Sequence, residues 1–200
     1  QSDLAICAMN LAKDIGAHVA TCYEDDLGQL YTAPMDMVMP PANYGVFFDA
    51  LQTLRKEREA KARQYFDRAA AVVGLPVVTL PSNGRPSVMW ISREGRQTCA
   101  FDTITDLVMI GSPGPQEHVV TWNVLEHALF AARRRVLVAP AGVQRVTFTR
   151  PLIAWNGSHE AENAVERCLD LLAPGATIHI VQSGHLRPGR TPARRVVEYL

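Results

Sequence analysis

Two glycine-containing turns carry the residues that could bind an anion. Gly111-Ser112-Pro113-Gly114 follows an apolar run, and its two glycines permit positive φ angles and a close approach of the backbone to a ligand. Asn156-Gly157-Ser158 follows a second apolar run, and Ser158 suits the N-cap of a helix. Backbone NH groups at such turns and helix starts hold phosphates and other anions. The two turns are therefore the candidate binding residues.

The sequence has no pattern typical of a catalytic or metal site. Ser158, His159 and Glu160 are consecutive, but neighbours at the start of a helix do not face one another, so we do not expect a catalytic triad. No group of histidines and carboxylates has metal-ligand spacing, and there is no P-loop, G-x-S-x-G or dinucleotide-binding G-x-G-x-x-G. We interpret His18 and His179 as packed or half-buried residues of two strands, and not as metal ligands.

Composition and charge narrow the class of protein. The 200 residues include 20 basic and 20 acidic side chains and are 48% hydrophobic. A core is therefore expected, whereas a broad electrostatic footprint for nucleic acid or for an anionic membrane is not. No apolar run reaches the ~18 residues of a membrane span. We expect a soluble, cytoplasmic protein, in which Cys7, Cys22, Cys99 and Cys168 are reduced, buried thiols and neither disulfides nor metal ligands.

The elements around the first turn form a β-α-β unit. Residues 107–110 and 136–138 are fully apolar runs, which is typical of parallel strands covered on both faces. Apolar residues at helical spacing from Val120 to Ala131 predict a helix between them. Residues 133–135, all arginine, are predicted to close this helix, where cations suit its dipole. The first turn thus lies at the carboxyl end of a parallel strand, where open α/β sheets bind ligands.

The remaining patterns predict elements along the rest of the chain. In chain order these are a helix over 3–15, a strand over 17–23, a long helix over 43–73, a strand over 87–91 that we favour over 77–80, a helix over 93–105, a strand over 151–155, a helix over 159–172 and a strand over 177–181. Gly16 and Gly74 end the first and the long helix. Charges of both signs over 55–63 indicate a solvated helix face. Met35, Met37 and Met39 pack under a loop or form an apolar lid.

An internal repeat suggests two domains. Gly16-Ala17 and Gly175-Ala176 each join a helical pattern to an apolar strand, and the offset of ~159 residues has the size of a domain. We therefore expect a first domain over 1–148 and the start of a similar second domain over 149–200. In this arrangement a strand is missing before Gln1 and most of a domain is missing after Leu200. In a rival arrangement, the strand over Leu152 to Trp155 fills the vacant position in the first sheet.

These motifs resemble the universal stress protein family. The strand before Gly111, the Gly-x-x-Gly turn and the closing V-L-V-A-P are similar to the end of such a domain, and L-I-A-W-N-G-S-H-E-A-E-N-A-V is similar to the start of the second domain in bacterial tandem members. The resemblance covers residues 2–23, 106–140 and 151–182, and the middle only in outline. It implies an α/β fold with an open five-stranded parallel sheet in strand order 3-2-1-4-5 and helices on both faces. It also implies pairing of two domains through their last strands, within one chain or as a homodimer.

The nucleotide-binding motif of that family is only half present. Its binding members carry G-x-x-G, nine residues and then G-S or G-T, and this chain has Val124 and Leu125 at the last two positions. Those members also have an acidic residue after the first strand, where the second copy has Asn156. The resemblance thus implies weak or no ATP binding by the first domain. The candidate contacts to ATP or another adenine nucleotide are Gly111, Ser112, Gly114, Asn156, Gly157 and Ser158.

Three functions fit these observations. The favoured one is a non-enzymatic stress-response protein of the universal stress type that binds or senses an adenine nucleotide, through the second domain if at all. The second is a ligand-free interaction scaffold of the same fold, which Val124 and Leu125 support. The third is an α/β enzyme that hydrolyses or transfers a group from ATP, for which the sequence supplies no catalytic base.

Overall fold

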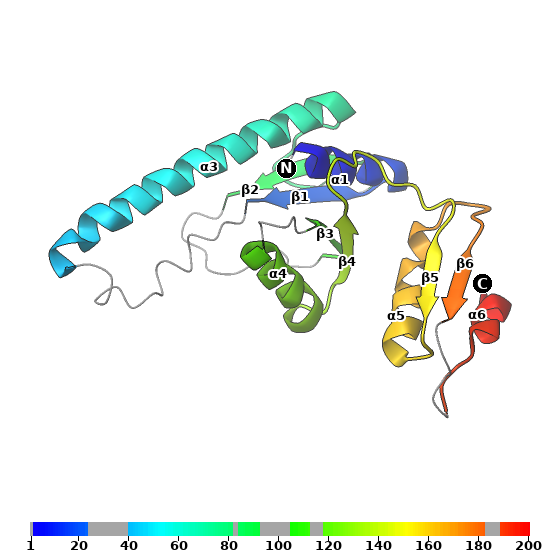
Figure 1. Cartoon of the computed structure of the whole chain (residues 1–200). Coiled ribbons are helices and arrows are strands. Elements are labelled where there is room, and N and C mark those ends of the chain that lie inside the picture. The colour runs from blue at the N-terminus through cyan, green and yellow to red at the C-terminus, as the bar shows by residue number, and fades with distance from the viewer. Residues whose placement is uncertain (1, 24–39, 82–83, 93–104, 113–117, 183–188) are drawn as a thin grey trace. The chain divides into compact units, whose positions relative to one another are not determined.

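The computed structural model describes residues 2–23, 40–81, 84–92, 105–112, 118–182 and 189–200 (Figure 1). The chain forms two compact units, residues 1–145 and residues 146–200, which are described separately. The described strands form three two-stranded parallel sheets. The protein is thus of mixed α/β type, and the five-stranded sheet that the resemblance implies is not seen in the described part of the chain.

The first strand pair of the first unit is covered by two helices. α1 (Ser2–Ile15) packs on β1 (His18–Cys22) and β2 (Ser87–Ile91), and α3 (Tyr44–Val73), which follows the 3-10 turn η2 (Pro41–Asn43), packs on α1 and β2. β1 and β2 are parallel, with His18 opposite Ser87. The core consists of Met9, Phe66, Ala69, Ala70, Val73, Leu75 and Val88. Its α3 members recur at helical spacing, so the last two turns of α3 make the contact.

Gly16 and Gly74 end α1 and α3, as predicted. Their φ angles are 70° and 74°, in the left-handed region that glycine adopts without strain. The NH of Gly74 donates to the carbonyl of Ala70 over 2.9 Å, which satisfies one of the last carbonyls of α3. Glycine is therefore required at these two positions for its backbone conformation.

The charged stretch of α3 is largely solvated, as predicted. Most of residues 55–63 are exposed. Arg63 binds within the protein instead: its guanidinium lies 5.2 Å from the ring centre of Phe66 and 5.7 Å from that of Trp90, and its Nε donates to Asp67 over 3.0 Å. This cation–π contact connects the end of the charged stretch to β2.

The second strand pair of the first unit is the predicted β-α-β unit. β3 (Leu107–Gly111) and β4 (Arg135–Ala139) are parallel, and α4 (His118–Glu126) continues into a π-helical turn, η4 (His127–Ala131). Val108 and Ile110 pack against Ala128. Apolar residues of the helix thus cover one face of this pair.

The prediction that the three arginines close this helix is wrong for Arg135. Arg133 has a φ of 51°, which turns the chain out of the helix, and Arg135 is the first residue of β4. The strand register is the physical reason, because it sets Arg135 opposite Leu107 and lets the Arg135 Nε donate to the carbonyl of Asp106 over 3.0 Å. Strand pairing therefore outweighs the favourable position of a cation at the helix end.

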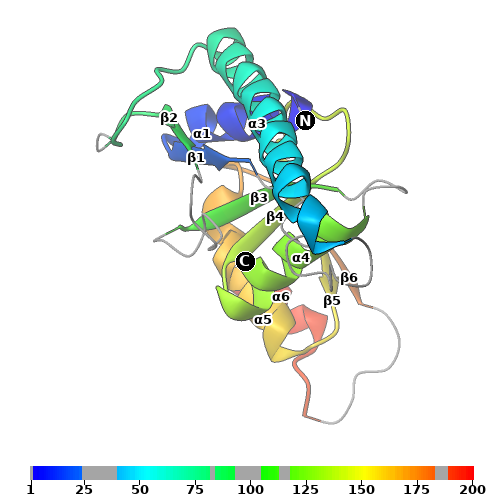
Figure 2. The same cartoon turned by 90° about the vertical axis from the view of Figure 1, so that its left-hand side faces the viewer.

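α1 also contacts the second strand pair. It packs against β3 as well as against β1 and β2, and a Cβ added to Gly111 would lie 3.7 Å from the Leu4 Cδ2. In both views β3 lies between β1 and β4 (Figure 1 and Figure 2). The segment after β4 returns to α1, where Gln144 binds Asp3 and Asn10, and Arg145 binds Asp14 over 2.9 Å. α1 thus joins the two strand pairs of this unit.

The second unit is a smaller β-α-β arrangement. It consists of β5 (Leu152–Trp155), α5 (His159–Cys168), the 3-10 turn η5 (Leu169–Leu171), β6 (His179–Gln182) and α6 (Ala193–Tyr199). β5 and β6 are parallel, with Leu152 opposite His179. Among the described strands β5 thus pairs with β6, as the two-domain arrangement expects.

Several expectations about single residues are corrected or fall outside the described residues. Cys7 is buried and Cys22 half-buried, but Cys168 is exposed, because it lies one turn after the exposed Ala164 on the same face of α5. His179 is exposed, because the described residues do not cover its side of the strand pair, which it shares with the exposed Leu152. Residues not described include Met35, Met37, Met39, Cys99 and nearly all of the helix predicted over 93–105. None of the described helices is long and apolar enough to cross a membrane.

Candidate functional site

The first turn is only partly described, and its described residues are engaged in the sheet. Gly111 is the last residue of β3 and does not have a positive φ, and a Cβ there would make an ordinary contact. The NH of Ser112 donates to the carbonyl of Ala139 over 2.7 Å, which extends the β3–β4 ladder. Gly114 lies outside the described residues. The Ser112 NH is therefore not available to a phosphate in this arrangement.

Val124 and Leu125 pack against the core. Both are half-buried on α4 and contact the cluster of Val108, Ile110 and Ala128. A glycine and a serine at these positions would remove apolar contacts and weaken the helix. The two residues therefore stabilise the first unit at positions where the family motif has its phosphate-binding pair.

The second turn is a helix cap. The Asn156 Oδ1 accepts from the NH of Ser158 over 3.0 Å, and Gly157 has a φ of 68°. The Ser158 Oγ accepts from the NH of Ala161 over 3.2 Å, which confirms Ser158 as the N-cap of α5. The polar side chains of this turn are thus bonded to its own backbone.

Two carboxylates occupy the first turn of α5. A hydrogen bond from Ser158 lowers the pKa of Glu160, and a hydrogen bond from Thr191, with a smaller contribution from His159, lowers the pKa of Glu162. Both groups are therefore ionised at neutral pH. Negative charge here complements the helix dipole and opposes a phosphate at the same end.

No catalytic triad or metal site is seen in the described parts of the chain. His159 is 89% exposed, and its Nδ1 lies 3.2 Å from the Glu162 Oε2, while Ser158 serves the cap. No group of three His, Cys, Asp or Glu side chains among the described residues could hold a metal ion.

His18 is half-buried and has a structural role. Its Nδ1 lies 2.9 Å from the Ser87 Oγ, and its Nε2 is buried without a hydrogen-bond partner among the described residues. Burial lowers the pKa of His18, and its hydrogen bond to Ser87 offsets this in part. The ring is thus held neutral between β1 and β2.

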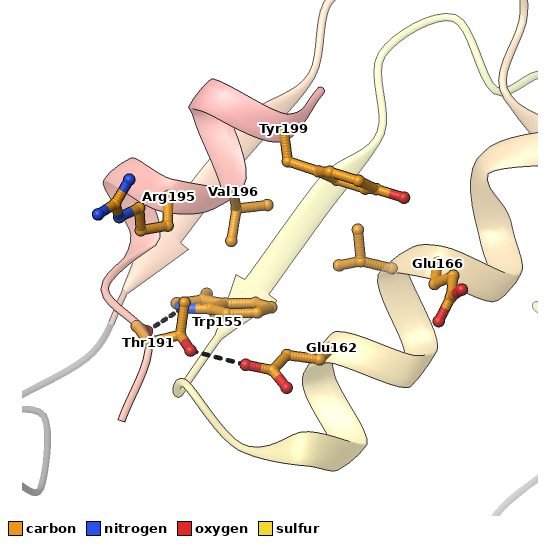
Figure 3. Close-up of a pocket in the computed structure, with 8 residues that line it drawn as sticks. Trp155, Glu162, Glu166, Thr191, Arg195, Val196 and Tyr199 are labelled. Atoms are coloured by element: carbon orange, nitrogen blue, oxygen red, sulfur yellow. Dashed lines mark hydrogen bonds between the residues drawn. The ribbon is translucent and has the colours of Figure 1, made fainter. Parts of the chain in front are cut away.

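A pocket in the second unit was not predicted from the sequence. It has a volume of about 330 Å³ and is lined on its apolar side by Trp155, Val165, Val196 and Tyr199 (Figure 3). The Trp155 Nε1 donates to the carbonyl of Thr191 over 2.8 Å, and the Thr191 Oγ1 donates to Glu162 over 2.7 Å. The only signals in the sequence are a tryptophan at a strand end and two glutamates four residues apart, Glu162 and Glu166.

Comparison of the chain with protein-family models, with curated proteins and with solved structures finds no match. The likeness to the universal stress family therefore depends on the sequence motifs alone.

Proposed function

We propose that the chain is part of a non-enzymatic stress-response protein of the universal stress type. In this proposal the strands of the first unit belong to a five-stranded parallel sheet in order 3-2-1-4-5. The second and third strands of this order are β1 and β2, and the fourth and fifth are β3 and β4. The place of the first strand lies between β1 and β3. The second unit is the start of a second, similar domain.

The arrangement around α1 carries this proposal. α1 contacts β1 and β3, and each of these strands has an edge without a strand partner among the described residues. A parallel strand between them would continue into α1 and β1 by a right-handed crossover, which is the strongly preferred connection in parallel sheets. The vacant place thus fits the first strand of the proposed order.

Two similar local structures support the repeat. Gly16 and Gly175 have φ angles of 70° and 73°, and each lies between a helical segment and a strand. The β5-α5-β6 arrangement then corresponds to the vacant strand, α1 and β1. The outer edge of β4 has no partner among the described strands, and we propose that it pairs with the last strand of another domain.

In this proposal the nucleotide binds to the second unit. In the first unit the NH of Ser112 is bonded within the β3–β4 pair, and the side chains of Val124 and Leu125 pack against the core. Asn156, Gly157 and Ser158 lie at the carboxyl end of β5, where parallel sheets bind ligands. The proposed ligand is ATP or another adenine nucleotide.

The second candidate, a ligand-free interaction scaffold, has its own support. Asn156 and Ser158 are bonded within the cap, and the carboxylates of Glu160 and Glu162 oppose an anionic ligand. Native mass spectrometry of the purified chain distinguishes the two functions. A bound adenine nucleotide that Asn156→Ala removes and Asn43→Ala retains would support the nucleotide-binding function. If no nucleotide is bound and calorimetry with ATP gives no heat, the result supports the scaffold function. Turnover of ATP would contradict both the nucleotide-binding and the scaffold function.

A further inference from the structure

The pocket of the second unit has an ordered aromatic floor. Trp155 is 3% exposed, and its indole NH is bonded to the carbonyl of Thr191. Val196 of α6 lies next to the ring and Tyr199 lies farther from it (Figure 3), and Val165 of α5 also lines the pocket. The volume of about 330 Å³ is at the lower end of the range of small-molecule sites. The space therefore suits a small ligand with an apolar body.

The charge in the pocket is negative. Glu162 and Glu166 are four residues apart on α5, so they lie on one face of the helix, and both line the pocket. Thr191 fixes Glu162 and keeps its pKa low. Arg195 also lines the pocket, but its Nη1 binds Glu198 over 2.9 Å. An anionic ligand would lie against two carboxylates here.

We propose that this pocket binds a small organic cation, namely a primary amine or guanidinium carried on an aromatic or short aliphatic body. The cationic group would bind the carboxylate of Glu166, with Glu162 beside it. The body would lie against the apolar lining of Val165, Val196 and Tyr199. A metal ion is a poorer occupant, because the described part of the pocket has two carboxylates and no third carboxylate, histidine or cysteine.

The contacts around Trp155 hold this site in shape. The end of β5, the start of α5 and the segment before α6 are joined by the Trp155–Thr191–Glu162 hydrogen bonds. The ring and one carboxylate are thus fixed relative to each other before a ligand arrives, which lowers the entropic cost of binding. The proposal does not depend on nucleotide binding, because it uses other side chains and a ligand of opposite charge.

The test is a titration of the ¹⁵N-labelled full chain, followed at the indole NH of Trp155, which Trp155→Phe identifies. The probes are 2-phenylethylamine, the neutral 2-phenylethanol and the anionic phenylacetate, which share one aromatic body. We expect the amine to shift the Trp155 signal saturably at millimolar concentration and the other two to bind at least about tenfold more weakly. Glu166→Gln should weaken amine binding about threefold to fivefold.

Two controls keep the test specific. Glu57→Gln makes the same charge change on an exposed part of α3 and should leave amine affinity unchanged. Val165→Phe should fill the pocket and abolish the shift while the remaining amide signals stay in place. Three results would overturn the proposal. The first is equal affinity for all three probes, and the second is no shift of the Trp155 signal by the amine at roughly 20 mM. The third is an equal effect of Glu166→Gln and Glu57→Gln on amine affinity.

Discussion

The indole Nε1 of Trp155 donates a 2.8 Å hydrogen bond to the backbone carbonyl of Thr191, 36 residues further along the chain. This bond connects the end of β5 to the segment that leads into α6. Thr191 in turn binds Glu162 of α5, so one residue links three elements of the second unit. The stability of this unit and the shape of its pocket therefore depend on the same contact.

Trp155→Phe should destabilise the second unit. The substitution removes the hydrogen bond to Thr191 and part of a ring that is 3% exposed, for a loss of about 1–3 kcal/mol. Hydrogen exchange of the amides in β5 and β6 measures the free energy of opening. Trp122→Phe, at a residue that is 47% exposed in the first unit, is the matched control and should change little. Equal small effects of both variants would show that the Trp155 contact is not stabilising.

Ser158→Ala should also weaken the second unit, because it removes the N-cap of α5. We expect a loss of about 1 kcal/mol, and Ser158→Asp should recover most of it, since aspartate is an equally good cap. Exchange of the amides in the first turn of α5 measures both changes. If alanine and aspartate behaved alike, the role of Ser158 as a cap would be wrong.

His18 should make the first unit less stable in mild acid. Burial lowers the folded-state pKa below the ordinary value of 6.5, so the unfolded chain takes up the proton first. The free energy of unfolding of the first unit therefore has its full value above pH 6.5. It decreases as the pH falls from 6.5 towards the folded-state pKa of His18. Thermal unfolding between about pH 8 and pH 5 should show this loss in the wild type and a smaller one in His18→Gln. His179→Gln, at an exposed histidine, should follow the wild type, and a loss that all three proteins share equally would exclude His18 as its cause.

Val124→Gly combined with Leu125→Ser restores the family's phosphate-binding residues, but we expect no gain of ATP binding. The two side chains pack on the cluster of Val108, Ile110 and Ala128, so the double variant should lose about 2–4 kcal/mol of stability. Calorimetry with ATP should give the same affinity, within about twofold, before and after the change. Phe130→Ser, at a residue that is 76% exposed, controls for the change in polarity. A tenfold gain of ATP affinity in the double variant would mean that these side chains block a working phosphate site.

Local features of the fold are predictable from the sequence. The apolar runs at 107–110 and 152–155 form strands, Gly74 ends the long helix, and Ser158 caps α5. Each of these depends on residues close in sequence, where periodicity and backbone preference determine the structure.

Features that depend on distant residues are not predictable in this way. Arg135 belongs to β4 because it pairs with Leu107 of β3, which lies 28 residues earlier in the sequence. The pocket depends on Trp155 meeting Thr191 and α6, and no local pattern indicates that contact. The exposure of Cys168 and His179 follows from which faces are covered, and composition does not show this.

The central claim is that the place between β1 and β3 is that of the first strand of a five-stranded sheet. A high-resolution experimental structure of the intact protein tests it most directly. We predict one parallel strand that is hydrogen-bonded to β1 on one side and to β3 on the other and continues into α1. Direct pairing of β1 with β3, or an antiparallel strand between them, would contradict the universal stress type of fold and the function proposed from it.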